Sequence, residues 1–169
     1  MDREYSFKIE NEDYDLLQDF NKVLNLIDLG RTPKNHYSDA SGKTTDGKMM
    51  NIEIKRRNQN LLPDLKISGE TYTASTIYIE THKAGSLYLD YATNNLIPIY
   101  INFLNDGVVV LYNLLRLSKR PETVVKKIYS KLYQSYELSK REELLLQDAW
   151  IYKKDENNEY KLIHKPNVE

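Results

Sequence analysis

Residues 51–57 constrain the fold most, because branched apolar and charged residues alternate along them. Side chains of a β-strand point alternately to its two faces. Ile52 and Ile54 are therefore expected to enter the core, while Glu53 and Lys55 share the other face. This alternation predicts a strand that is buried on one side and carries an acid and a base on the other.

The remaining pattern predicts an α/β fold, in which a mixed sheet is covered by helices. Strands are expected where β-branched and aromatic residues cluster, and helices where apolar residues recur at helical spacing. The expected strands are 4–9, 36–42, 49–56, 75–80, 97–104, 108–114, 150–153 and 160–164, with a loop at 57–74. Expected helices span about 12–29, with Gly30 as C-cap, and 84–94. Two more are expected, one beginning at Pro121 and one after the capping-box pattern Ser139-Lys140-Arg141-Glu142.

Length and composition narrow the class of protein. The 169 residues suit one domain, which we divide into a core at about 12–114 and a C-terminal helical and hairpin extension at about 115–169. The chain has no cysteine, which excludes disulfides and thiolate metal sites. We find no apolar run of the roughly 20 residues that a membrane span needs and no signal-peptide pattern, so we expect a cytoplasmic protein without a membrane partner.

The turn before residue 49 decides which acids meet. Asp46-Gly47 is a typical hairpin turn. With a two-residue turn, Asp39 would pair with Ile54 and point away from Glu53, because paired residues share a face. We therefore predict a bulge near residues 41–43, or a turn of odd length, which would bring Asp39 beside Glu53.

A carboxylate on one strand and Glu-x-Lys on its neighbour suit a magnesium-dependent phosphodiesterase. Carboxylate oxygens are ligands that Mg²⁺ prefers, and the ion activates water for attack on phosphorus. Other acid-x-Lys matches begin at Asp46, Asp64 and Glu159, but these lie in a turn, a loop and a polar tail. Only Glu53 and Lys55 interleave with core residues, although the same pattern also fits a solvated strand face.

Here the chain resembles the PD-(D/E)XK (restriction-endonuclease-like) nuclease superfamily over residues 12–104, about half its length. The resemblance implies an αβββαβ core, followed here by the C-terminal helices. It also implies Asp39 and Glu53 as ligands of Mg²⁺ or Mn²⁺, Lys55 as the catalytic lysine that orients or deprotonates water, and DNA as the partner. A homodimer is compatible with it. The Pro-Asp pair of the family is absent, because Asp39 follows Ser38.

The source of further acids stays open. Glu80 completes the metal shell if its strand neighbours Glu53. Alternatively, Glu53 is the first acid and Glu80-Thr81-His82 a degenerate second element, with Lys83 nearby. Asp13 or Glu12 on the first helix is a further candidate, but we assign these acids to the helix dipole, which favours acids in a first turn.

Local basic residues are the candidates for contacts with nucleic acid. The net charge is −1 and the pI about 6.3, so any DNA-binding surface must be local. We expect Arg56, Arg57, Lys127 and Lys131 to contact phosphates, although a solvated helix face is the simpler explanation of the last two. The histidines are too scattered for a zinc site. The leading hypothesis is a metal-dependent DNA endonuclease, and the rival is a non-catalytic nuclease-like module that binds protein or nucleic acid.

Overall fold

The computed structural model describes residues 3–33, 36, 38–58, 77–130 and 134–166; of residues 3–10 and 130 it describes the backbone alone. The elements are α1 (Arg3–Leu24), β1 (Ile27–Arg31), β2 (Ala40–Lys43), β3 (Met49–Arg56), β4 (Ile77–Glu80), α2 (Thr81–Asn94), β5 (Ile97–Phe103), β6 (Val108–Asn113), β7 (Glu122–Ser130), β8 (Ser135–Leu144), the 3₁₀ helix η1 (Leu146–Asp148), β9 (Trp150–Lys154) and β10 (Tyr160–His164).

Seven strands form the main sheet, in the order β1-β2-β3-β5-β6-β9-β10. Its neighbours pair antiparallel except for β3 and β5, which are parallel from Met50↔Ile97 to Arg56↔Phe103. Parallel neighbours need a crossover connection, and the connection here includes α2. A second sheet has the order β4-β8-β7, with antiparallel pairs throughout.

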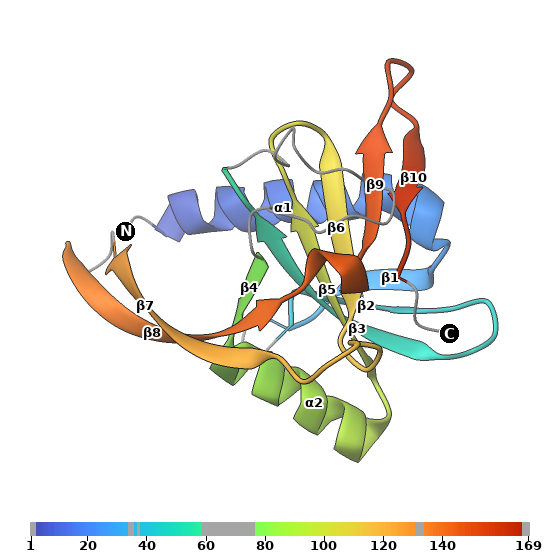
Figure 1. Ribbon diagram of the computed structural model, residues 1–169. Coiled ribbons are helices and arrows are strands. Elements are labelled where there is room, and N and C mark those ends of the chain that lie inside the picture. The colour runs from blue at the N-terminus through green and yellow to red at the C-terminus, as the bar shows by residue number, and fades with distance from the viewer. Residues whose placement is uncertain (1–2, 34–35, 37, 59–76, 131–133, 167–169) are drawn as a thin grey trace.

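The main sheet separates two apolar cores. Figure 1 shows α1 and α2 on either side of this sheet. Residues Leu17 and Phe20 of α1 pack against one face, together with Ile52 and Ile54 of β3. The other face packs against α2 and the small sheet, through Leu87 and its neighbours. Strands β5 and β6 are buried on both faces, so each reads as a continuous apolar run rather than an alternating one.

The α/β class with a mixed sheet is confirmed. The expected order of one helix, three strands, one helix and one strand is found in the main sheet as α1, β1–β3, α2 and β5, while β4, which precedes α2 in the chain, belongs to the second sheet. Strand 49–56 is found with these bounds, as β3. The hairpins expected within 97–114 and 150–164 are present as β5–β6 and β9–β10. Their turn signals are local, which is why the sequence alone located them.

The expected N-terminal strand at 4–9 is wrong, because these residues belong to α1. That helix also ends earlier than predicted, at Leu24 rather than 29. Asn25 follows with φ 52°, a left-handed conformation that asparagine tolerates at a helix end. The side chain of Asn21 then holds Leu26 by hydrogen bonds to its backbone N–H and carbonyl groups. Gly30 therefore lies in β1. The apolar residues leading up to this strand continue the helical spacing, so the sequence alone does not reveal it.

The C-terminal helices predicted after Pro121 and Ser139 are also wrong, because these segments form β7 and β8. The apolar residues of 124–133 do recur at helical spacing, but many of those in β7 are β-branched and favour strands. β8 lies between β7 and β4, so its backbone groups pair on both sides. A capping-box pattern cannot compete with the ladder that β8 forms along β7 and, at residues 141–144, with β4.

No described helix is both long enough and apolar enough to span a membrane. Most of the loop expected at 57–74 lies outside the described residues, and so does Lys131.

Asp19 connects α1 to the far edge of the main sheet, and its removal should weaken the fold in a pH-dependent way. It accepts hydrogen bonds from Lys154 Nζ at 2.7 Å and Tyr160 Oη at 3.1 Å, besides Lys22 of its own helix. These bonds, that from Lys154 above all, lower the pKa of Asp19 to about 2. The folded pKa lies below the ordinary value of 3.8, so the carboxylate stabilises the fold above about pH 4 and ceases to do so as pH falls toward 2.

We expect Asp19→Asn to lower the free energy of unfolding by about 1 kcal/mol at pH 7, with a difference from the unsubstituted protein that shrinks as pH falls toward 2. Urea denaturation across this range measures it. Asp15→Asn, at an exposed position of the same helix, is the control and should change little. A pH-independent loss in Asp19→Asn would contradict the assignment.

Candidate active site

The turn between β2 and β3 has odd length, as predicted. Lys43 pairs with Met49, so five residues, 44–48, connect the two strands without a bulge in the ladder. Thr44 N–H donates to the Lys48 carbonyl at 2.8 Å, and Gly47 adopts φ 89°, a conformation that glycine favours. With this register Asp39, one residue before β2, lies opposite Glu53.

Asp39 and Glu53 form an acidic pair on the α2 side of β3. Asp39 is exposed, and its Oδ2 accepts a hydrogen bond from Ile54 N–H at 2.7 Å. Glu53 is only 1 % exposed. Burial, reinforced by the Asp39 charge and opposed by Lys83, raises the pKa of Glu53 to about 7. The pair therefore creates a place where additional positive charge is strongly favoured.

Lys83 of α2 provides part of this charge, because its Nζ bonds Glu53 Oε1. Burial disfavours the Lys83 ammonium, but the Glu53 carboxylate outweighs this effect and the pKa of Lys83 is raised. The sequence offered only proximity to Glu80 as a signal for Lys83. Its contact with Glu53 depends on α2 folding back across β3, which no local pattern specifies.

A narrow crevice of about 10 Å³ opens beside this pair, about the space that one water molecule needs. Lys55 lines it and is exposed, on the same face of β3 as Glu53. Glu80 lines it too, at the end of β4, so the structure brings three of the four expected catalytic residues to one crevice. However, Glu80 is engaged by Arg141 Nη2 at 3.6 Å and His82 Nε2 at 3.5 Å.

Asp13 lies beside the site, and our assignment of it to the helix dipole is wrong. α1 begins at Arg3, so Asp13 lies about three turns into the helix. Burial raises the pKa of Asp13, with a contribution from the Asp39 charge, while Arg56 and Lys55 oppose the rise. Its Oδ1 is buried and accepts no hydrogen bond from the described residues, although Arg56 Nε approaches to 3.4 Å.

The residues expected to bind nucleic acid are separated. Arg56 pairs with Glu12 at 2.8 Å and with Asp13. Arg57 is half-buried and donates to Asn102 Oδ1 at 2.6 Å, Tyr100 Oη at 2.8 Å and the Tyr78 carbonyl, so it connects β3, β4 and β5. Lys127 lies on β7, away from the crevice.

The side chains at the site have the chemistry that a divalent cation prefers, but they offer few ligands. Glu53 Oε2 is buried and has no hydrogen-bond partner among the described residues, next to the Asp39 carboxylate. Two carboxylates are enough for Mg²⁺, which keeps several waters. However, the described part of the chain contains no group of three or more histidine, aspartate or glutamate side chains arranged to hold a metal ion. Asp39 and Glu53 are thus the residues that fit such an ion.

Comparison with known proteins gives one structural match. No protein-family model matches the sequence, and no curated protein matches it. Among solved structures, the chain is similar to Hjc, a Holliday junction resolvase from the archaeal hyperthermophile Archaeoglobus fulgidus. The TM-score is 0.45 at 11% identity, and the match covers 76% of this chain and 84% of that chain.

The Lys83–Glu53 pair should contribute to stability. Lys83→Met removes the cation that opposes the rise of the Glu53 pKa, so at neutral pH the buried carboxyl must take up a proton or stay charged without its partner. We expect the free energy of unfolding at neutral pH to fall by about 2 kcal/mol. The double variant Glu53→Gln/Lys83→Met should recover most of this loss, because it removes both charges. Chemical denaturation of both variants, with Lys43→Ala at an exposed position of β2 as control, measures the coupling. Equal loss in the single and double variants would contradict a direct pair.

Proposed function

We propose that this protein is a metal-dependent phosphodiester hydrolase that cleaves DNA, with Asp39 and Glu53 as ligands of Mg²⁺ or Mn²⁺. The observation that carries the proposal is the buried Glu53 carboxylate with an unsatisfied oxygen beside Asp39. A buried acid without sufficient positive charge is costly. Binding of a cation would offset this cost, and Asp39 would present the ion at the protein surface, where a large substrate can reach it.

Lys55 is the proposed catalytic lysine. It shares the crevice with Glu53, and its exposed ammonium is free to contact a phosphate oxygen and to orient the attacking water. The water oxygen adds to phosphorus and loses a proton to solvent, while the bond from phosphorus to one deoxyribose oxygen breaks and that oxygen is protonated. The chemistry that a bound divalent ion supplies is activation of water and stabilisation of charge on the phosphate.

Asp13 and Glu80 take supporting places in this proposal. Asp13 of α1 interacts electrostatically with Asp39, so in this proposal it would orient a water bound to the ion. Glu80 stays a proposed further ligand, which must leave Arg141 in order to bind an ion.

A second candidate function rests on the Lys83–Glu53 pair. An ammonium group already neutralises part of the charge that a metal would neutralise. This favours a non-catalytic module of the same architecture that binds nucleic acid or protein.

Cleavage assays decide between these functions. With Mg²⁺ or Mn²⁺ the purified protein should cleave labelled single-stranded, duplex or branched DNA, and EDTA should abolish the reaction. Lys55→Ala, Asp39→Asn and Glu53→Gln should each reduce the rate by at least about 100-fold while circular dichroism stays unchanged. Lys43→Ala, an exposed lysine on the neighbouring strand, is the control and should retain activity.

Titration of Mn²⁺ binding gives a readout besides activity. Asp39→Asn and Glu53→Gln should each weaken binding, whereas Lys55→Ala should leave it. A folded protein that binds no metal and cleaves none of the three DNA forms would support the non-catalytic module instead.

A further inference from the structure

Strands β7 and β8 form an arm that extends from the body of the molecule toward the same side as the start of α1 (Figure 1). The pairs Val125↔Lys140, Lys127↔Leu138 and Tyr129↔Tyr136 place alternate residues of both strands on one face. We call these six residues the tyrosine face of the arm.

The tyrosine face is unusually apolar for an exposed surface. Val125 is 58% exposed, Tyr129 50%, Tyr136 65% and Leu138 76%, and none of the four belongs to either core. The two tyrosine rings meet edge to face with centroids 5.3 Å apart. Lys127 Nζ lies 4.9 Å from the centre of the Tyr136 ring. Contiguous exposed apolar surface usually marks a site of interaction.

The charges select the class of partner. The two charged residues of the tyrosine face are both lysines, Lys127 and Lys140. β7 is also an edge strand, with Lys126 at its centre. If β7 paired symmetrically with β7 of a second copy, Lys126 at its centre would lie opposite Lys126 of that copy. Like charges directly opposite each other are unfavourable. A polyanion with apolar, stackable groups satisfies the lysines and the tyrosines together.

We propose that the tyrosine face binds an unpaired strand of nucleic acid, with bases on Tyr129, Tyr136 and Leu138 and phosphates on Lys127 and Lys140. Proteins that bind single strands combine these same two elements, aromatic platforms and positive charge. Bases of a closed duplex are stacked on one another and do not offer their faces to tyrosine rings.

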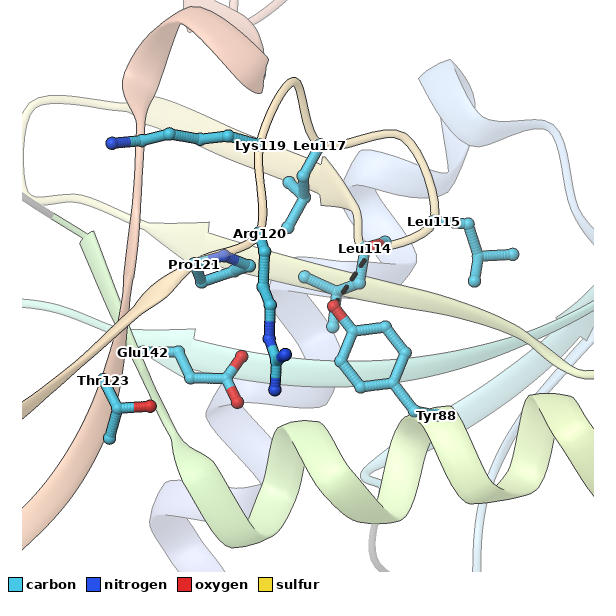
Figure 2. A pocket seen from close by; sticks show the side chains of 9 residues that line it. All are labelled: Tyr88, Leu114, Leu115, Leu117, Lys119, Arg120, Pro121, Thr123 and Glu142. Carbon is cyan, nitrogen blue, oxygen red and sulfur yellow. Dashed lines mark hydrogen bonds between the residues drawn. The ribbon is translucent and has the colours of Figure 1, made fainter.

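The same face continues inward to a hollow of about 400 Å³ at the base of the arm. The next pair along the ladder, Thr123↔Glu142, lines this hollow together with Arg120. Figure 2 shows Arg120 beside Glu142 on one side and Tyr88 across from them. Six residues of strand separate Thr123 from Tyr129, about 20 Å. This length of strip, ending in a hollow of ligand size, suits several consecutive nucleotides.

The arm also borders the crevice through its other face. Arg141 neighbours Lys140 on β8, points to the opposite side, and contacts Glu80. A strand on the tyrosine face is thus separated from the crevice by the thickness of one sheet. If the proposed nuclease function holds, on which this step rests, the substrate class is DNA in which an unpaired strand lies next to the strand that is cut.

Binding without metal tests the arm independently of cleavage. Fluorescence anisotropy in EDTA compares a short labelled single strand with the blunt duplex of the same sequence. We expect the single strand to bind more tightly, and Tyr136→Ala to weaken it about tenfold. Tyr136→Phe should retain binding, because the ring remains. Tyr91→Ala, an exposed tyrosine on α2, is the matched control. Lys127→Ala should reduce the slope of log affinity against log salt by roughly 0.7.

Three results would overturn the proposal: tighter binding of the duplex, unchanged single-strand binding in Tyr136→Ala, or a dimer in sedimentation that Leu138→Glu dissociates without affecting DNA binding. The last result would assign the face to a second copy. The failure of one proposal can be distinguished from the failure of the other. If single-strand binding depends on the arm but the protein cleaves no DNA with any metal, only the nuclease function is refuted.

Discussion

The candidate site depends on a carboxylate buried in the middle of β3. Glu53 belongs to a strand with neighbours on both sides and lies under α2, so it is almost fully removed from bulk water. Its charge is tolerable only with positive charge nearby. Lys83 meets one oxygen and Asp39 adds a second negative charge, which leaves Glu53 Oε2 as an unsatisfied acceptor among the described residues.

The connection between the parallel strands β3 and β5 explains how this charge balance arises. The chain must cross from one edge of the pair to the other, and α2 lies within that crossover. The first turns of α2 consequently bring Lys83 over Glu53, while Asp90, further along, accepts a hydrogen bond from Asn51 at 2.7 Å. The helix is thus fixed to β3 by polar contacts at two points, and the crevice lies beside the first of them, the contact of Lys83 with Glu53.

The arm is held to the body of the molecule by strand pairing. β8 pairs with β4 at its inner end, where Ile77 and Ile79 are buried, and with β7 along its whole length. One strand therefore carries core residues near the body and exposed tyrosine and leucine farther out. The crevice and the tyrosine face lie on opposite sides of β8, because Arg141 and Lys140 are successive residues of that strand.

Local patterns determined the class of fold and strand β3. The sequence left the connection before β3 open between a bulge and a turn of odd length, and the structure chose the odd turn that places Asp39 opposite Glu53. Alternation and turn chemistry act between residues close in sequence, so they can be read from the chain itself. Three features needed the tertiary structure: the strand character of β7 and β8, the contact of Lys83 with Glu53, and the contact of Asp13 with Arg56. Each depends on a partner many residues away in the sequence, and apolar spacing compatible with a helix becomes a strand when a neighbouring strand pairs with it, as β8 pairs with β7.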